Sequence, residues 1–536
     1  MSATLQKSGS LSVAVAVSRV LGLGREALFS RLVGAGALAD AYSVAFRIPN
    51  LLRDLLAEGA LSSAFVPTFT AALVQEDRAR ADHLANLVLA LLLLLTGTLT
   101  LLGIVYAEQV VGLITAGWSP AKIAEAAALT RIMMPLLILV SLGAVWTGML
   151  NAQRRFLAPA YAPALFNVVS VLVGVALLIA GAGGIWAVTA WSVGTLCAGV
   201  VQALILLPPL WRLGYRPHLA LRGAWNHPGV RRIARLMLPA LVGVAALQIN
   251  IFVNTRFAAS LGDGPVARLE YAFRIFYLPI GMFGVALATV ATTQLSEEAA
   301  RGDRGGLVQK TAESLSALWL LTAASTVGLV VLAEPIVSLI YEGGRFTAAD
   351  TTAVAAILRA YALGLVPYSM VKIVAPAFYA TDRPRLPLLA SVSAIAATIA
   401  FNAAFYRQLG APGLALGTSL GALVNVGLLR LFFARTVGPL ARPGRARELA
   451  WLLLANLLMG AVLHAAWTGA QLGLTRLHLP GPLATLALAL VLGLLVLLGF
   501  LVYVRVLLWG RFPAADGLAR LPGALLRKLR RRPPAK

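Results

Sequence analysis

The chain has 536 residues, of which 59% are hydrophobic and only 12% are charged, and its mean hydropathy is +0.84. A soluble protein carries about 25% charged residues to keep its surface hydrated, so this composition excludes a soluble globular protein. The net charge of +24 would suggest a nucleic-acid partner in a soluble protein. Here the cations are placed as in a membrane protein, and we expect no nucleic-acid partner. The single cysteine, Cys197, excludes an internal disulfide and a cysteine-based zinc site.

Apolar runs of about 20 residues, enough to cross a hydrocarbon core roughly 30 Å thick, recur along the whole chain. Backbone polar groups in lipid must be paired within the segment, so each run is expected to form a helix. The sequence shows none of the repeated alternation that a membrane barrel requires. It therefore predicts an all-α polytopic membrane protein. The expected transmembrane helices number about fourteen and lie near residues 10–34, 39–66, 84–107, 127–150, 160–181, 185–210, 232–260, 267–295, 313–333, 351–378, 386–406, 412–434, 449–470 and 482–508.

The loops between these segments differ in their lysine and arginine content. The connections after even-numbered segments and the C-terminal tail hold most of the loop cations, and the odd-numbered loops hold only scattered ones such as Lys122 and Arg345. The connection after the sixth segment holds Arg212, Arg216, Arg222, Arg231, Arg232 and Arg235. By the positive-inside rule both termini are cytoplasmic, and the basic tail at 511–536 is expected to contact anionic lipid headgroups.

The sequence also repeats at an offset of about 228 residues, which predicts parallel repeats about an axis along the membrane normal. "AFRI" at 45–48 returns at 272–275, and "NAQRRFLAP" at 151–159 returns as "YATDRPRLP" at 379–387. We therefore expect four parts. These are an N-terminal six-helix lobe at 1–215, a second six-helix lobe at 216–440, two additional transmembrane helices at 441–510 and the basic cytoplasmic tail at 511–536.

Ionisable residues interrupt the first, second, seventh and eighth apolar segments. They are Arg19, Arg25, Glu26 and Arg31, then Asp40, Arg47, Arg53, Asp54 and Glu58, then Arg256, Arg268, Glu270 and Arg274. A charge at mid-membrane costs about 2.5–3.5 kcal/mol, so such groups must pair or face a water-filled cavity. At about 100° per residue, the acids of the second segment and Arg47 share one helix stripe roughly 40° wide. This stripe favours a cavity.

Arginines outnumber acids among these residues. A cavity with excess guanidinium suits an anionic substrate, because the planar group can bind phosphate through two parallel hydrogen bonds. The alternative is structural: Arg31 and Asp40 flank a short hairpin, and Arg47 pairs with Asp54 or Glu58. The sequence contains no nucleophile–base arrangement, no metal-ligand spacing among its five histidines and no ATP-binding motif. We therefore predict neither an enzyme nor a bound metal or cofactor.

The stretch "SRVLGLGREALFSRLVGAGALADAYSVAFRIPNLLRDLLAEGALSSAFVPTF" at 18–69 resembles the opening of the MurJ (MviN) family of lipid II flippases. The portion "RIPNLLRDLLAEGALSSAFVP" is its most specific part. The resemblance implies a member of the multidrug and polysaccharide-lipid exporter superfamily. It implies alternating access in a bacterial inner membrane, which moves undecaprenyl-diphosphate-linked disaccharide-pentapeptide (lipid II) to the periplasmic leaflet.

The resemblance also implies which charged residues serve transport. Family arginines match Arg19, Arg25, Arg53 and, through "YAFRI", Arg274, and family acids match Glu26, Asp40 and Glu58. The sequence departs from the family pattern at Asp54, where a basic residue is common, and at Phe273, where an acid can precede the arginine. The placement of charges within the apolar segments adds Arg47, Asp54, Arg256 and Glu270 as further candidates.

Taken together, the cavity and the resemblance predict that Arg25, Arg53 and Arg274 hold the diphosphate and the headgroup carboxylates. The acids Glu26, Asp40 and Glu58 are then expected to order these arginines in the empty cavity. The last two helices would receive the isoprenoid tail. The implied partners are lipid II, the surrounding membrane lipids and other proteins of cell-wall synthesis.

Two other functions stay open. One is a flippase for another polyprenyl-diphosphate-linked oligosaccharide. The other is a drug or cation antiporter of the same superfamily, whose cavity would be lined with acids. A scaffold without transport activity would need no charged cavity.

Overall fold

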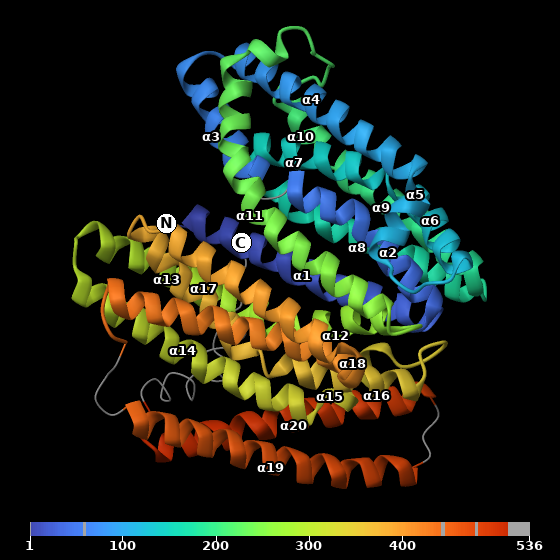
Figure 1. Ribbon diagram of the computed structural model, residues 1–536, viewed down its shortest axis with the longest axis vertical. Coiled ribbons are helices and arrows are strands. Elements are labelled where there is room, and N and C mark those ends of the chain that lie inside the picture. The colour runs from blue at the N-terminus through green and yellow to red at the C-terminus, as the bar shows by residue number, and fades with distance from the viewer. Residues whose placement is uncertain (1, 57–59, 441–444, 478–480, 513–536) are drawn as a thin grey trace, which may run out of the picture. The chain divides into compact units, whose positions relative to one another are not determined.

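The computed structural model describes residues 2–56, 60–440, 445–477 and 481–512, and Figure 1 shows its helices. Glu58 and the basic tail beyond residue 512 lie outside the described residues. The described residues form helices joined by short turns, without a β-strand, and Gly343 and Phe346 form one isolated bridge. The prediction of an all-α protein is confirmed.

The chain divides into two compact units, Met1–Glu270 with Ile340–Asp350, and Tyr271–Leu339 with Thr351–Lys536. The helices of the first unit are α1 (Ser2–Val33), α2 (Ala37–Leu56), α3 (Ala60–Gln75), α4 (Arg78–Val105), α5 (Ala107–Ile114), α6 (Pro120–Met133), α7 (Leu136–Ala152), α8 (Leu157–Ile179), α9 (Gly184–Leu204), α10 (Leu207–Arg212), η1 (Ala224–Asn226) and α11 (Pro228–Ala259). The second unit contains η2 (Ile280–Gly284), α13 (Val285–Ala300), α14 (Arg304–Val331), α17 (Leu365–Ala380), α18 (Arg385–Thr436), α19 (Arg445–Leu477) and α20 (Gly481–Trp509). The boundary between the units falls within α12 (Pro265–Pro279), α15 (Ala333–Tyr341) and α16 (Ala348–Ala362).

Among the described residues, 9 helices are long and apolar enough to cross a membrane, or up to 11 if each of two bent pairs counts as one span. The bent pairs are α2 with α3 and α16 with α17, and each is bent by 41°. The prediction of a multi-pass membrane protein is therefore confirmed. Where its residues are described, each predicted segment overlaps helical structure, but the total of about fourteen spans stays a prediction.

The longest helix, α18, contains the boundary that the sequence predicts between the segments 386–406 and 412–434. Its 52 residues are interrupted at Gly410, whose φ of 61° and ψ of −150° are not helical. A residue with a side chain is strained at this φ, and glycine adopts it readily. Pro412 follows two residues later and cannot donate a helical hydrogen bond. The helix therefore breaks at Gly410 without a separate loop.

In the first unit, α1 packs along α8, and α8 packs along α9, as Figure 1 shows. Small residues permit this close approach: a Cβ added at Gly174 of α8 would lie 2.7 Å from the ring of Trp191 in α9. Asn167 of α8 donates from Nδ2 to the carbonyl oxygen of Ser18 in α1 at 2.9 Å. A larger apolar core joins α3, α4, α7 and α10 around Phe65 and neighbouring side chains. These contacts fix the direction of α1, which carries Arg25.

In the second unit, one apolar core joins α13, α14, α17 and α18. A further core joins α14 to the C-terminal pair α19 and α20 through Leu320, Leu463 and Leu507. Tyr503 of α20 donates from its hydroxyl to the carbonyl oxygen of Leu320 at 2.7 Å, inside this second core. The C-terminal pair is therefore packed against α14 of this unit.

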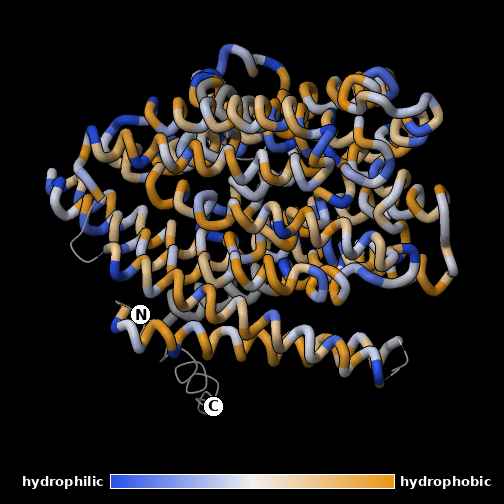
Figure 2. The backbone as a smooth tube through the Cα atoms, turned by 60° about the horizontal axis from the view of Figure 1, so that its bottom comes forward, coloured by the Kyte–Doolittle hydropathy of each residue, from blue (hydrophilic) through white to orange (hydrophobic). Residues whose placement is uncertain are grey.

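Many large apolar side chains remain exposed on the described helices, among them Leu457 of α19 and Leu494 of α20. Figure 2 shows hydrophobic residues along the lengths of the helices and hydrophilic residues gathered toward the connecting turns. A soluble protein rarely exposes such extended apolar surface. A helix surface in contact with lipid acyl chains has this character.

Candidate functional site

Arg25 of α1 is paired with the next residue in the chain. Its Nη2 lies 2.6 Å and its Nε 3.2 Å from Oε1 of Glu26. The Arg25 and Glu26 side chains are only 14% and 12% exposed, so the pair is largely shielded from solvent. The Arg25 guanidinium also lies 5.4 Å from the ring centroid of Phe166 in α8, a cation–π contact. Because the carboxylate accepts from Nε and Nη2, Nη1 is left available for a further acceptor.

Arg53 of α2 repeats this arrangement with Asp54. The Arg53 Nη2 and Nε atoms lie 2.7 and 3.0 Å from Oδ1 of Asp54. The second carboxylate oxygen, Oδ2, accepts from the amide of Gln248 in α11 at 3.4 Å. Asp54, where the sequence departs from the family pattern, is therefore an acid partner of Arg53.

Arg47 lies before Arg53 in α2 and has partners from two other helices. Its guanidinium donates to Glu270 of α12 and to the hydroxyl of Thr255 in α11. The structural alternative paired Arg47 with Asp54 or Glu58. Asp54 instead binds Arg53 and Gln248, and Glu58 lies outside the described residues. Its acid partner, Glu270, lies 223 positions further along the chain, and helix spacing cannot reveal so distant a contact.

Asp40 is completely buried at the start of α2 and has a full set of hydrogen-bond donors. Lys122 of α6 donates to Oδ2 at 3.1 Å, and the backbone N–H groups of Gly264 and Ala267 donate at 2.7 and 2.8 Å. The latter two lie at the N-terminal end of α12, where the helix dipole favours an anion. Asp40 was expected to order the arginines, but its described partners are a lysine and the backbone of α12.

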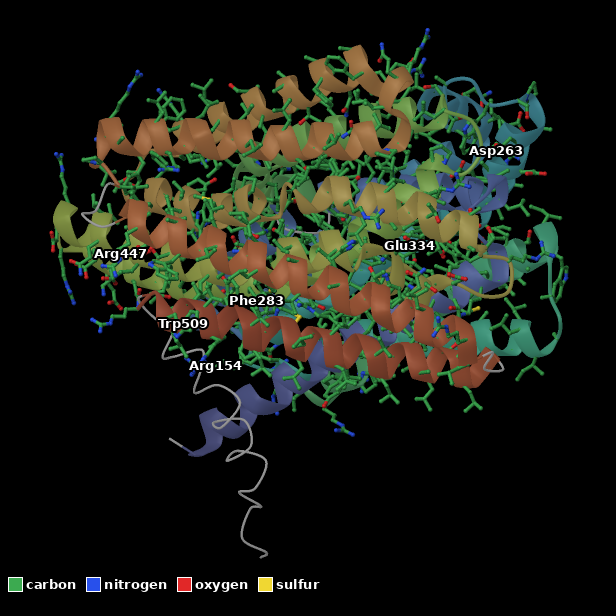
Figure 3. All side chains as sticks on the ribbon, turned by 90° about the horizontal axis from the view of Figure 1, so that it is seen from below. Arg154, Asp263, Phe283, Glu334, Arg447 and Trp509 are labelled. Carbon is green, nitrogen blue, oxygen red and sulfur yellow. The ribbon has the colours of Figure 1, made fainter. Side chains whose placement is uncertain are left out.

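Lys122 was assigned from the sequence to the scattered loop cations, yet its side chain is only 8% exposed. Its Nζ atom also binds Asp263 at 2.7 Å and lies 4.0 Å from the ring centroid of Trp118. Figure 3 labels Asp263, in the turn between α11 and α12. The sequence signal that could have located Lys122 is its position beside Trp118 and Pro120, at the start of a helix.

The other predicted residues are dispersed. Arg19 is exposed on α1. Arg256 of α11 is exposed and donates to the carbonyl oxygen of Leu113 in the last turn of α5, where the helix dipole favours a cation. Arg274 is half-buried on α12, in the second unit, and Glu58 lies outside the described residues.

The structure also reveals a basic residue that sequence reasoning missed. Lys372 of α17 is half-buried in the second unit, with Nζ 5.9 Å from the ring centroid of Tyr277 and 5.8 Å from that of Tyr368. Tyr277 lies three residues after Arg274 on α12. The signal was available, since Lys372 is a basic residue inside the apolar segment 351–378.

The hairpin end of α1 is held by the segment 340–350. The backbone N–H of Arg345 donates to the carbonyl oxygen of Arg31 at 2.9 Å, and Arg268 binds Asp350 at 2.9 Å. Arg31 and Asp40 were considered as hairpin flanks, and both have such structural contacts. No group of three or more His, Cys, Asp or Glu side chains that could hold a metal ion occurs in the described part of the chain.

The first unit thus presents three arginines, Arg25, Arg47 and Arg53, on its first two helices, and each is held by a carboxylate. Guanidinium groups partly shielded from water bind phosphate and carboxylate oxygens more strongly than exposed ones do, because the local dielectric is lower. A carboxylate next to each arginine keeps the guanidinium oriented without a ligand. In this arrangement a guanidinium can exchange its carboxylate partner for an anionic group of a ligand.

Comparison with known proteins identifies the family of this chain. The family described as "Lipid II flippase MurJ" matches residues 29–481. A protein of Burkholderia cenocepacia named "Lipid II flippase MurJ" is 34% identical over 494 residues, covering 90% of this chain and 95% of that protein. The chain belongs to the MurJ family of lipid II flippases. A "Probable lipid II flippase MurJ" of Bdellovibrio bacteriovorus is 35% identical over 441 residues, 80% of each chain.

Solved structures agree with the MurJ assignment. The chain superimposes on "Lipid II flippase MurJ, inward closed conformation" with a TM-score of 0.75 at 25% identity, covering 94% of this chain and 98% of that one. An inward-facing multidrug transporter of the MATE family and the MOP superfamily matches with a TM-score of 0.67 at 17% identity, which shows a shared fold. The MurJ family consists of lipid transporters. The prediction of a transporter in cell-wall synthesis, and not an enzyme, is therefore confirmed.

Proposed function

We propose that this protein moves lipid II from the cytoplasmic to the periplasmic leaflet of a bacterial inner membrane by alternating access. The names of the related proteins support the substrate. The observation that carries the proposal within this chain is the presence of arginines on apolar membrane helices, each already held by a carboxylate. Charged groups on membrane helices cost free energy, so they usually mark a functional site. A diphosphate is a ligand that guanidinium groups bind well.

In this mechanism Arg25, Arg53 and Arg274 each contact the diphosphate or the headgroup carboxylates during transport. Arg25 and Arg53 exchange Glu26 and Asp54 for substrate oxygens, so no guanidinium is left without an acceptor before binding or after release. Arg19 and Glu58 remain transport residues by family resemblance. Among the further candidates, Arg47 and Glu270 hold α2 against α12, and Arg256 caps α5.

Asp40 takes a different role in this proposal from the one that the sequence suggests. Its burial and its bonds to Lys122, Gly264 and Ala267 support a structural joint between α2, α6 and α12. A buried carboxylate with three donors has little capacity for a further ligand. The joint would hold the end of α2 while the arginines further along it bind substrate.

The repeat in the sequence supports two six-helix lobes at 1–215 and 216–440, with 441–510 as an addition that receives the isoprenoid tail. The packing of α19 and α20 on α14 and the exposed leucines of this pair are compatible with a lipid-facing role. The distribution of loop cations supports cytoplasmic termini. Proteins that synthesise or polymerise lipid II are the expected partners.

The runner-up is a drug or cation antiporter, which the MATE-like fold admits. An antiporter of cations needs carboxylates that are available to its substrate. Here Glu26, Asp54 and Glu270 each hold an arginine, and Asp40 holds a lysine. These pairs favour an anionic substrate. A flippase for another polyprenyl-diphosphate-linked oligosaccharide would use the same arginines and differ in the sugars it accepts.

The deciding experiment is depletion of the protein in its host, followed by measurement of lipid II on each face of the inner membrane. We expect lipid II to accumulate on the cytoplasmic face and cell-wall synthesis to stop. Normal export of lipid II after full depletion would refute the proposal. Accumulation of a different lipid-linked oligosaccharide would indicate a flippase for that oligosaccharide. Drug sensitivity without any lipid accumulation would indicate the antiporter.

A further inference from the structure

A groove of about 410 Å³ opens in the first unit where α8 begins and where the chain passes from α9 into α10. Its volume lies within the range of about 300–1,000 Å³ that is usual for ligand pockets. One wall is formed by Leu157, Tyr161 and Leu165, which lie four residues apart and so share one face of α8. The other wall contains Pro208 and Pro209 and ends at Arg212. The groove is apolar except at this one end.

The backbone creates this groove. Helix α9 ends at Leu204, and Pro208 and Pro209 begin the short helix α10. Proline lacks the N–H that would continue the preceding helix and is favoured in a first helical turn. On the opposite side, Arg154 has a left-handed φ of 57°, which turns the chain sharply before α8 begins at Leu157. The groove is therefore a product of two chain breaks.

The length of the groove matches one leaflet of a membrane. From Leu157 to Leu165 the α8 wall extends about 12 Å at 1.5 Å per residue, and one leaflet of a hydrocarbon core is about 15 Å deep. The candidate spans Leu157–Ile179 and Gly184–Arg212 begin and end here, so the groove starts at the membrane boundary. Trp211 is exposed beside Arg212, and tryptophan is enriched at this depth.

The mouth of the groove is basic. Arg212 lines it, and Arg154 and Arg155 directly precede the segment that begins its α8 wall at Leu157. All three arginines are exposed, and none of them forms an ion pair within the described residues. The sequence contains no Asp or Glu between Glu125 and Asp263, so nearby residues of this segment cannot neutralise them. Figure 3 shows Arg154 and Asp263, both of the first unit, toward opposite ends of its helices. Arg154 therefore lies at the end of the helices away from Asp263.

We propose that this groove binds one acyl chain of an anionic phospholipid and that Arg212, with the arginines at 154–155, holds its phosphate. Apolar walls select a chain, and the basic mouth selects a negatively charged headgroup. The guanidinium of Arg212 offers a fork of donors that matches phosphate oxygens. The leaflet is the one at the Leu157 end of α8. The proposal concerns a resident lipid and is independent of the transported substrate.

Native mass spectrometry of the purified full chain tests this proposal with phosphatidylglycerol and phosphatidylethanolamine of identical acyl chains. We expect the wild type to retain one phosphatidylglycerol with a preference of about tenfold, because the contact is charge-assisted. R212Q should abolish this preference. The matched control is R222Q, which removes an exposed arginine of the same acid-free segment outside the groove. Equal retention of both lipids by the wild type, or equal loss in R222Q, would overturn the proposal.

Filling the groove tests the acyl chain separately. Ala158 lines the groove, so A158F should reduce retention of both lipids. V175F places the same ring on an exposed position of α8 and should leave retention unchanged. Phosphatidylglycerol with a photoreactive acyl chain should cross-link to 157–165 or 205–212 in the wild type. This measurement does not depend on the folding of any variant, and cross-links confined to other segments would refute the proposal.

Free glycerol 3-phosphate distinguishes a lipid headgroup from a soluble phosphate. It carries the phosphate without an acyl chain, so we expect it to compete with phosphatidylglycerol only weakly. Competition at the same concentration as the lipid would show that the arginines bind soluble phosphate and that the groove contributes nothing.

Discussion

The Nζ atom of Lys122 lies 3.1 Å from Oδ2 of Asp40, although 82 residues separate them along the chain. Both side chains are buried, and the same carboxylate accepts from the backbone N–H groups of Gly264, just before α12, and of Ala267 in its first turn. This pair therefore connects three helices that are distant in sequence. A buried ion pair is strongly destabilised when one partner is removed, since the remaining charge is left without compensation.

We predict that D40A destabilises the protein by about 3–5 kcal/mol, because Lys122 loses its buried acid partner. D40N keeps an acceptor for Gly264 and Ala267 and should be less harmful. Adding K122M to D40N should recover part of the loss, since the unpaired charge is then gone. Membrane abundance and the thermal unfolding of purified protein measure these effects. A D40A protein that is as abundant and stable as the wild type, yet does not transport, would mean that Asp40 acts on the substrate.

Substitution of the arginines should reduce transport, whereas substitution of Asp40 should reduce stability. R25A, R53A and R274A should each reduce lipid II flipping by about tenfold or more, because a charge-assisted contact in a shielded site is lost. Lysine at the same positions should rescue only partly, since it lacks the planar fork. Flipping and membrane abundance are measured together for each variant. Normal flipping by all three alanine variants would exclude these residues as the binding site.

A matched control for these variants exists in Arg131, which binds Glu108 at 3.0 Å in an exposed pair. R131A should change neither flipping nor abundance, because exposed ion pairs contribute at most about 1 kcal/mol. Structural damage at Arg25 is tested by the double variant R25A/E26Q. If the R25A defect were only an orphaned acid, removal of the Glu26 charge would restore the protein and its activity.

Cysteine labelling tests the orientation of the chain. In a variant with Cys197 replaced by alanine, cysteines at Arg216 and Arg222 should be shielded from a membrane-impermeant thiol reagent in intact cells, because their loop is rich in cations. Cysteines at Ser260 and Ala349, both exposed, should be labelled. Gly264 is unsuitable, since a Cβ there would lie 2.4 Å from the carbonyl oxygen of Ala35. Labelling of the Arg216 loop from outside would reverse the predicted topology.

The C-terminal helix pair can be tested without deleting it. A Cβ added at Gly460 of α19 would lie 3.0 Å from Val327 of α14, so a leucine there should push α19 away. We expect G460L to accumulate in the membrane but to flip lipid II poorly. G469L is the control, because a Cβ at Gly469 meets nothing within 4 Å. A truncation after Arg435 should show the same defect, and full complementation by the truncated protein would contradict a role in transport.

The sequence was sufficient to predict the helices and to find charged residues within the apolar segments, because both depend on local pattern. Long apolar runs specify helices wherever they occur, and a charge within such a run is visible without a structure. The break at Gly410 was likewise predictable, since it lies between two apolar runs and shortly before Pro412.

The pairing of these charges could not be predicted. Helix spacing grouped Arg47 with Asp54. In the structure Asp54 binds Arg53, its neighbour in the chain, and Arg47 binds Glu270. Such partners depend on how distant helices pack, which local pattern does not encode. Lys122 was assigned to a loop, and Lys372 was overlooked although it interrupts an apolar segment. The aromatic partners of both lysines come from how the helices pack, which helix spacing does not show.

The break at Gly410 has a practical consequence for work on this protein. Its two helical halves meet with no connecting segment between them, so the joint offers almost no chain to a protease, an antibody or a fused reporter. An epitope inserted there would have to replace the glycine turn itself and would alter the angle between the halves. The residues 219–223, which lie between α10 and η1 and are largely exposed, can accept such an insertion while the adjoining helices keep their ends.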